Sequence, residues 1–355
     1  MRSDANDFWV DPNAKLCLSV AEACFASLKC RTSVSQHNTR YFALPGITLT
    51  VDSVGAEVGT LLTAAFAPRE ISKPPLDADV LVWRIGDVEG TGENPIFPEL
   101  PTAMDGLGNF NSSMDGNLFI ERRHGLTSVY DHKTRVITSI CRGVNTLEND
   151  LIAKPILRFL MGILQQKGIH LAHAALVGLN GRGLLVTGKG GMGKSTISSI
   201  ALRNGLSFCG DDFVALKRTD DGIIGYSLYA TLLLYPSQIA QHPHFNEHCR
   251  VSNSVEIPKT AIILGSDFDA QTVGSLIVDA IAVPQITEQP LSKLCPMSRA
   301  AALRALTPTS VFSSPWREVD RARFLMGLAV DLKCFAYHSG SDFPKISDPV
   351  SERYG

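Results

Sequence analysis

Apolar and polar residues alternate with a period of two over much of the first part of the chain. The alternation is clearest over residues 41–51, 80–88 and 117–123, and it predicts β-strands there. Residues 116–142 alternate on both sides of a central turn and predict a small antiparallel meander. Residues 86–116 are rich in Gly, Pro, Asn and Asp and predict a long loop. Together these patterns predict an α+β fold, and its residues suggest no chemistry.

The pattern changes at about residue 146, where apolar positions take on helical spacing. Residues 151–164 predict a helix that begins at a cap, Asn149 or Asp150, and ends at Gly168. Pro155 falls in the first turns of this segment and disturbs them. A helical segment therefore opens the second half of the chain.

A strand, a glycine-rich turn and a helix follow one another directly after this segment. Residues 184–187 predict the strand, and residues 194–204 predict a helix that stops at Gly205. Residues 207–216 predict the next strand. Strands that alternate with a helix in this order are typical of an α/β domain.

The length of 355 residues and the hydrophobic content of 45% provide core material for two domains. We place an α+β domain of unknown role at residues 1–147 and an α/β domain at residues 148–355. The formal net charge of −2 gives no attraction for nucleic acid or an anionic membrane. No apolar run approaches the ~18–20 residues that span a bilayer. The expectation is a protein with no nucleic-acid or membrane partner.

The eight cysteines are scattered, and no CxxC pair occurs among them. We interpret them as reduced thiols. The first residues carry acids where a signal peptide needs a basic stretch followed by an apolar one. Both features predict a cytoplasmic protein, and its oligomeric state stays open, a homo-oligomer included.

The string GKGGMGKS at residues 188–195 satisfies the phosphate-loop pattern G-x-x-x-x-G-K-[ST] and lies between a predicted strand and a predicted helix. Glycines let the backbone turn its N–H groups toward phosphate oxygens. Lys194 would supply a charge to the β- and γ-phosphates of ATP or GTP, and Ser195 a hydroxyl to Mg²⁺. The predicted nucleotide-binding residues are Gly188, Lys189, Gly190, Gly191, Met192, Gly193, Lys194, Ser195 and Thr196.

Two adjacent acids, Asp211 and Asp212, stand in the next predicted strand. Side chains of neighbouring strand residues point to opposite faces, so one acid is a candidate base while the other helps to hold the metal. A solvated Gly-Asp-Asp turn is the alternative. His173 stands at the start of an earlier strand, where a histidine is more often a packed or capping residue than a catalytic one.

The stretch from His173 to Leu216 resembles the catalytic core of the HPr kinase/phosphorylase family, which is similar in fold to nucleotide-dependent phosphoenolpyruvate carboxykinases. The positions that match in register are His173, Gly188, Gly193, Lys194, Ser195, Arg203, Gly205, Asp211 and Asp212. The resemblance implies that Asp212 is the base on a protein serine, that His173 and Lys194 assist, and that Ser195 holds Mg²⁺. With Asp211 as a further metal ligand, the expected activity is transfer of a γ-phosphoryl group from ATP or GTP to a hydroxyl.

The chain departs from the family at one point, because a second, glycine-containing signature with Glu and Arg is missing after the Asp pair. HPr is therefore not the expected substrate. Later segments, to about residue 347, resemble HPr-kinase-related proteins of peptide-modification gene clusters. The expected acceptor is a serine of a protein or peptide.

Two other interpretations stay open. Lys189 gives the loop the KGGMGKST pattern of the deviant Walker ATPases, in which an extra lysine contacts nucleotide across a dimer, although those loops usually lie near the chain start. A module that senses nucleotide without transferring phosphate is the second.

Two further clusters contain side chains that can bind a metal or a phosphate. The residues His242, His244, His248 and Cys249 have ligand types that suit zinc, but a solvated loop is the preferred interpretation. A solvated helix face is likewise preferred for Arg317, Arg321 and Arg323.

Overall fold

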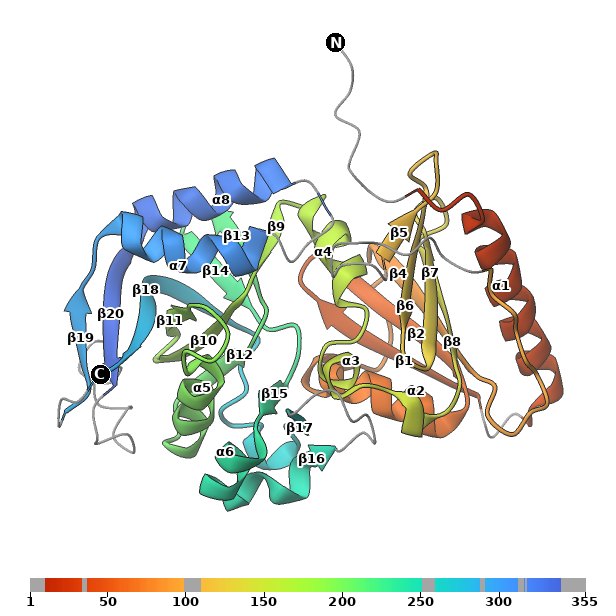
Figure 1. Cartoon of the computed structure of the whole chain (residues 1–355), viewed down its shortest axis with the longest axis horizontal. Helices are drawn as coiled ribbons and strands as arrows, with labels where there is room; N and C mark the ends of the chain where they lie inside the picture. Colours follow the sequence, from red (N-terminus) through yellow and green to blue (C-terminus); the bar gives the residue numbers. More distant parts are fainter. Residues whose placement is uncertain are drawn as a thin grey trace, which may run out of the picture. The chain divides into compact units, whose positions relative to one another are not determined.

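The computed structural model describes residues 10–33, 37–98, 110–250, 259–287, 291–311, 316 and 318–339. The chain forms two compact units, which divide between Phe159 and Leu160. Both units contain helices and sheets, so the protein has a mixed α/β fold with several sheets (Figure 1).

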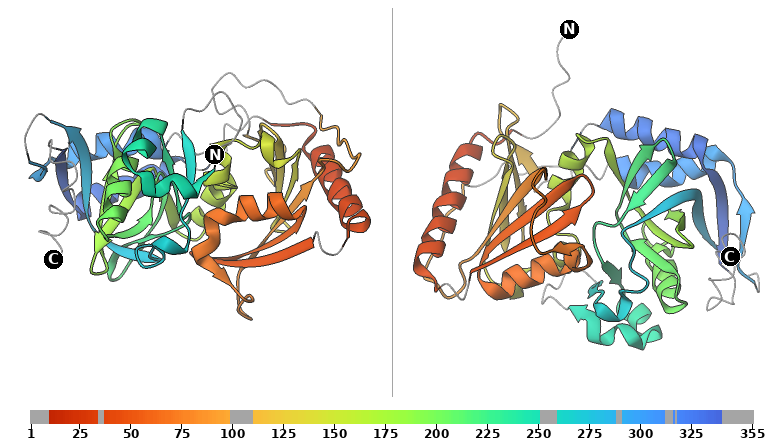
Figure 2. Two further views of the ribbon diagram at one scale, coloured as in Figure 1. Left: turned by 90° about the horizontal axis from the view of Figure 1, so that it is seen from below. Right: turned by 180° about the vertical axis from the view of Figure 1, so that it is seen from behind.

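The first unit is built on an eight-stranded sheet with the order β3-β1-β2-β4-β8-β7-β6-β5. Its strands are β1 (His37–Leu44), β2 (Ile47–Val54), β3 (Glu70–Ile71), β4 (Val80–Asp87), β5 (Phe110–Ser112), β6 (Leu118–Arg123), β7 (Leu126–Asp131) and β8 (Val136–Cys141). Helix α1 (Ala14–Arg31) covers one face and shares an apolar core with β6, β7 and β8, and α2 (Ala56–Thr63) follows β2. Figure 2 shows α1 lying along this sheet from two further directions.

The sequence prediction for this unit is confirmed in most elements. The alternating segments form β1, β2 and β4, and β6, β7 and β8 pair as the predicted antiparallel meander. The predicted loop at residues 86–116 is wrong at both ends, because β4 runs to Asp87 and residues 110–112 form β5. A strand of three residues is too short to show an alternating pattern.

The predicted single helix at residues 151–164 is also wrong. The segment forms two short helices, α3 (Asn149–Ala153) and α4 (Leu157–Gln165), and Glu148 occupies the N-cap position of α3. Pro155 lies in the break, and Ile156 after it has a left-handed φ of 50°. Proline removes a helical N–H and its ring clashes with the preceding turn, which explains the interruption.

The second unit contains a nine-stranded mixed sheet whose main path is β12-β10-β11-β18-β14-β13-β9. The strands on this path are β9 (Ile169–Ala172), β10 (Ala174–Leu179), β11 (Arg182–Thr187), β12 (Ser207–Gly210), β13 (Val214–Thr219), β14 (Gly222–Tyr226) and β18 (Ser275–Ile286). Strand β20 (Lys333–Ser339) runs parallel to β18 and pairs with β19 (Lys293–Pro296). A separate three-stranded sheet consists of β15 (Thr231–Leu234), β17 (Thr260–Ile263) and β16 (Cys249–Arg250).

Helices cover both faces of the large sheet (Figure 1). On one face, α5 (Lys194–Arg203) and the small sheet bury one apolar cluster, and α6 (Pro236–Gln241) follows β15. On the other face, α7 (Arg299–Val311) and α8 (Glu318–Asp331) bury a second cluster. The predicted order of strand, glycine-rich turn and helix is confirmed in β11, the turn at residues 188–193 and α5.

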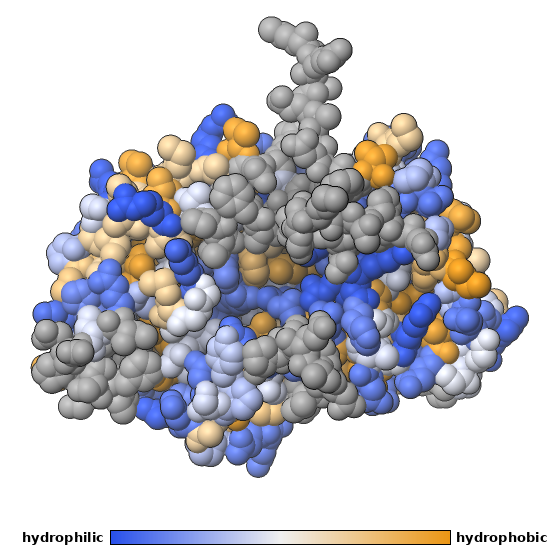
Figure 3. Space-filling model, viewed as in Figure 1, coloured by the Kyte–Doolittle hydropathy of each residue, from blue (hydrophilic) through white to orange (hydrophobic). Residues whose placement is uncertain are grey.

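The described part of the chain holds no helix that combines the length and the apolar character needed to cross a membrane. Large exposed apolar residues include Leu16 and Val330. On the face drawn in Figure 3, hydrophobic and hydrophilic residues are interspersed.

Candidate active site

The loop between β11 and α5 is built on glycines with unusual backbone angles. Gly188, Gly191 and Gly193 have φ values of 153°, 82° and 95°, which other residues rarely adopt. A Cβ on Gly188 would also lie 3.1 Å from the Met192 sulfur. These angles explain three of the four glycines of the GKGGMGKS string in physical terms, and the loop leads directly into α5.

Lys194 begins α5 and is buried although it carries a charge. Its Nζ donates hydrogen bonds to the carbonyl oxygens of Gly188 at 2.8 Å and Lys189 at 3.3 Å. The ammonium group is therefore folded over the loop, while Lys189 itself is exposed. A loop at a helix N-terminus with a lysine charge over it is an arrangement that favours an anion such as a phosphate.

Asp211 and Asp212 lie in a tight turn, which is the alternative that the sequence left open beside a strand, but Asp211 is buried and not solvated. Strand β12 ends at Gly210, and β13 begins only at Val214. The Phe213 N–H donates to the Asp211 carbonyl at 2.8 Å, and Asp212 between them has a left-handed φ of 65°. The two carboxyl groups have different partners because of this turn, and not because side chains alternate along a strand.

Asp211 is buried and accepts a hydrogen bond from the Ser198 hydroxyl at 3.0 Å. Burial raises the pKa of Asp211, and the charge of Asp212 adds to the rise, while the hydroxyls of Ser195 and Ser198 and the charge of Lys194 oppose it. The second oxygen of Asp211, Oδ2, is buried and has no hydrogen-bond partner among the described residues.

The surroundings of Asp211 fit a magnesium ion. Mg²⁺ prefers oxygen ligands and is usually held by one or two carboxylates together with waters and substrate phosphates. The buried Oδ2 of Asp211 and the nearby Ser195 hydroxyl supply such oxygens. Among the residues with described positions, no three or more His, Cys, Asp or Glu side chains gather to form a complete metal cage.

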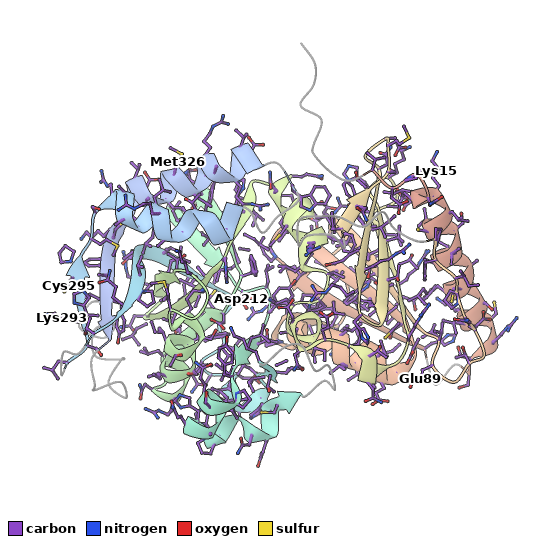
Figure 4. All side chains as sticks on the ribbon, viewed as in Figure 1. Lys15, Glu89, Asp212, Lys293, Cys295 and Met326 are labelled. Atoms are coloured by element: carbon purple, nitrogen blue, oxygen red, sulfur yellow. The ribbon has the colours of Figure 1, made fainter. Side chains whose placement is uncertain are left out.

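Asp212 is joined to His173, which lies between β9 and β10. The His173 Nε2 and the Asp212 Oδ1 are 2.7 Å apart, and the imidazole stacks on the Phe213 ring with centroids 5.2 Å apart. The His173 N–H donates to the Ser310 hydroxyl at 2.9 Å, and its carbonyl accepts from Thr187 at 3.3 Å. His173 is thereby fixed to the end of β11 and to α7. Figure 4 labels Asp212 in this region.

Two residues of the matched pattern lie away from this group. Arg203 is exposed in the last turn of α5, at the opposite end of the helix from Lys194, and Gly205 follows it with a φ of 74°. Gly205 ends the helix as predicted.

Sequence reasoning missed Ser198, although a signal for it was present. Ser198 follows Lys194 by four residues, and residues four apart lie on the same face of a helix. It also missed Phe213, Thr187 and Ser310, because their roles depend on tertiary contacts.

The segment with the histidines and Cys249 is not the predicted loop: His242 caps α6, a 3₁₀ helix spans Pro243–His248, and Cys249 begins β16. His242 is buried, and burial, with the charge of Arg203, lowers the pKa values of His242 and His244. The His244 ring lies 4.1 Å from that of Phe245. The histidines pack as part of this small helical segment.

The predicted solvated helix face of arginines is wrong for Arg321. This residue is buried, and its guanidinium donates to the Gln165 side chain at 3.0 Å and the Ser310 carbonyl at 3.4 Å. Arg323 is exposed, as expected, and lies 3.6 Å from Asp320. Arg317 lies outside the described residues.

Comparisons with known proteins give little beyond this geometry. No protein-family model matches the chain, and no curated protein matches it. Among solved structures, the HPr(Ser) kinase/phosphatase from Coxiella burnetii is similar with a TM-score of 0.29 and 13% sequence identity, over 52% of this chain and 95% of that chain. The features of this chain that bear on its function are the glycine-rich loop and the aspartate turn.

Proposed function

We propose that this protein is a kinase that uses ATP or GTP with Mg²⁺ and transfers the γ-phosphoryl group to a hydroxyl, the serine of a protein or peptide. The observation that carries the proposal is the 2.7 Å contact between His173 and Asp212. The turn that contains Asp212 also contains the buried Asp211, and the charge of Lys194 acts to lower the pKa of Asp211. A carboxylate base, an oxygen site for a cation and an anion-binding loop therefore belong to one small region of the second unit.

The loop and α5 would hold the triphosphate. The backbone N–H groups of the glycine-rich turn and the N-terminal end of α5 attract negative charge. Lys194 would exchange its hydrogen bonds to the Gly188 and Lys189 carbonyls for phosphate oxygens. Ser195 and Asp211 would hold Mg²⁺, which when bound neutralises charge on the transferring group.

Asp212 would act on the acceptor. As the hydroxyl oxygen forms its bond to the γ-phosphorus and the bond to the β-bridging oxygen breaks, the hydroxyl proton passes to the Asp212 carboxylate. His173 holds one carboxylate oxygen through its Nε2 and so fixes the direction of the other. The stacking of His173 on Phe213 keeps the imidazole in place.

Replacement of Asp212 by asparagine tests the proposal. Asp212→Asn should bind nucleotide as the wild type does and lose phosphoryl transfer about 10²–10⁴-fold, the usual contribution of a general base. Lys194→Ala should lose both nucleotide binding and phosphoryl transfer. The matched control is Asp269→Asn, at an exposed aspartate of the same unit. The readouts are calorimetric nucleotide binding and transfer of label from γ-labelled ATP into serine-containing peptides or lysate protein.

Three results would contradict the proposal. Full transfer by Asp212→Asn would remove its role as base. Unchanged nucleotide-dependent activity in Lys194→Ala would remove the phosphate-loop assignment. Tight binding by the wild type with no transfer to any acceptor would indicate a nucleotide-sensing module instead.

A further inference from the structure

Tyr235 is an exposed aromatic residue beside the first turn of α5. The residue is 38% exposed and lies between the end of β15 and the start of α6. Strand β15 and α5 share one apolar core, in which Leu234 is fully buried. The large sheet and its helix therefore fix the place of the Tyr235 backbone, while the residue itself remains partly open to solvent.

A single glutamine joins Tyr235 to the first turn of α5, directly after the glycine-rich turn. Gln238 accepts a hydrogen bond from the Tyr235 N–H at 2.9 Å with its Oε1 and donates one to the Thr196 hydroxyl at 2.6 Å with its Nε2. Thr196 is buried in the first turn of α5, two residues after Lys194. The side-chain amide of Gln238 therefore connects the Tyr235 backbone directly to the end of α5 that would hold phosphates.

Lys259 adds a positive charge beside the aromatic ring. Its Nζ lies 5.1 Å from the centre of the Tyr235 ring, within the range of a cation–π contact. The pairing of Leu234 with Thr260 in the small sheet brings the two residues to the same end of the strand pair. Because the ammonium lies over one face of the ring, a ligand base would stack on the opposite face, with a cation nearby.

We propose that Tyr235, Gln238 and Lys259 form the nucleoside-binding surface of the site, and that a purine base stacks on the Tyr235 ring. The inference rests on the proposed function, because it places the base of the nucleotide whose phosphates the loop would hold. Every nucleobase has a π face, and stacking on an exposed aromatic side chain is a common way to bind one. Gln238 is a positioning residue, which fixes Tyr235 relative to Thr196.

Calorimetric titration of the full chain with MgATP and with magnesium tripolyphosphate separates the base from the phosphates. Tyr235→Ala should weaken ATP binding about ten-fold or more, the usual contribution of one base–aromatic stack. Tripolyphosphate has no base, so its affinity should stay unchanged in this variant. Tyr235→Phe keeps the ring and should restore ATP binding, and Met326→Ala, at an exposed residue of α8 labelled in Figure 4, is the surface control.

Two further variants test the partners of the ring. Lys259→Met should weaken ATP binding by a smaller factor, while Lys293→Met, at an exposed lysine of β19 labelled in Figure 4, should not. Gln238→Leu should raise the KM for ATP with kcat unchanged, because it weakens the binding of the ground state and the transition state equally. A purely structural role for Gln238 would instead change kcat and the melting temperature.

The outcomes distinguish this inference from the proposed function. Wild-type ATP affinity in Tyr235→Ala, with tripolyphosphate still bound, overturns the inference and leaves the kinase proposal standing. If Tyr235→Ala weakens the binding of ATP and of tripolyphosphate equally, the ring supports the structure of the loop, and the inference is also overturned. A wild-type chain that binds neither ligand overturns the phosphate-loop assignment, and the inference with it.

Discussion

Glu121 in the first unit and Asp211 in the second are both buried carboxyl groups, and they differ in what surrounds them. Glu121 lies on β6, 3.6 Å from the Arg158 guanidinium, and the charge of Arg123 also favours its ionised form. Asp211 accepts a hydrogen bond from the hydroxyl of Ser198, and its Oδ2 has no hydrogen-bond partner among the described residues. Burial raises the pKa of both groups.

Glu121 has an arginine at ion-pair distance, whereas Asp211 has hydroxyl partners, the charge of Lys194 and one oxygen without a hydrogen-bond partner among the described residues. Arginines of the first unit balance Glu121, and the neighbouring contacts of Arg123 with Glu148 and Asp150 belong to the same network. A buried carboxylate without such a partner is costly, so a site that retains one gains by binding a cation. Glu121 is therefore explained by folding, and Asp211 by the proposed binding of Mg²⁺.

The largest expected difference between the two acids is in phosphoryl transfer. Asp211→Asn should lower the transfer rate about 10³-fold, because a metal ligand supports several kcal/mol of charge stabilisation in the transition state. Glu121→Gln should transfer label at a rate close to that of the wild type. Initial rates with γ-labelled ATP measure both, and a similar loss in the two variants would remove the distinction.

The next effect is on stability in the presence of ligand. Mg²⁺ and a non-hydrolysable ATP analogue at 100 times the Kd should stabilise the wild type by about 2.7 kcal/mol. Glu121→Gln should keep this gain, and Asp211→Asn should lose most of it. Chemical unfolding with and without ligand gives the values, and an undiminished gain in Asp211→Asn would show that the cation is held elsewhere.

The dependence of stability on pH should reveal the same site without nucleotide. A carboxyl group whose pKa is raised by folding contributes stability below its ordinary pKa, here 3.8, and loses it as the pH rises through the folded value. Asp211→Asn should therefore gain stability relative to the wild type as the pH increases above about 4. Added Mg²⁺ should narrow that difference, and a difference that does not change with pH would argue against a perturbed Asp211.

The smallest effect concerns the hydroxyl that contacts Asp211. Ser198→Ala should cost about 1–3 kcal/mol of unfolding free energy, because it removes a hydrogen bond to a buried carboxyl group. Ser199→Ala is the matched control, since Ser199 is equally buried and donates to the Thr196 carbonyl instead. Equal costs in denaturant unfolding would mean that Ser198 has no special relation to Asp211.

The sequence predicts β11, the glycine-rich turn and α5 well, because their signals are local. A few neighbouring residues are enough to predict each of these features: the glycines at positive φ, the apolar strand before them, and the helix that ends before Gly205. The meander of the first unit leaves a similar mark in its period of two.

Other features could not be predicted because they depend on distant contacts. The Gly-Asp-Asp segment is compatible with a turn or a strand, and the burial of Asp211 beside Ser198 is a tertiary feature that the segment alone does not reveal. Arg321 is buried, and its guanidinium donates to Gln165, which lies 156 positions away in the sequence. The pattern around Arg321 alone does not reveal this partner. The contact between His173 and Asp212 joins residues 39 positions apart, so no local pattern in the sequence predicts it.

The central claim is that Asp211 receives a cation beside the bound nucleotide, as Glu121 does not. Paramagnetic Mn²⁺ can replace Mg²⁺, and electron paramagnetic resonance can count the bound ions in the presence of a non-hydrolysable ATP analogue. The account predicts tight Mn²⁺ binding with nucleotide in the wild type and in Glu121→Gln, and its loss in Asp211→Asn. Undiminished Mn²⁺ binding in Asp211→Asn, with nucleotide still bound, would contradict it.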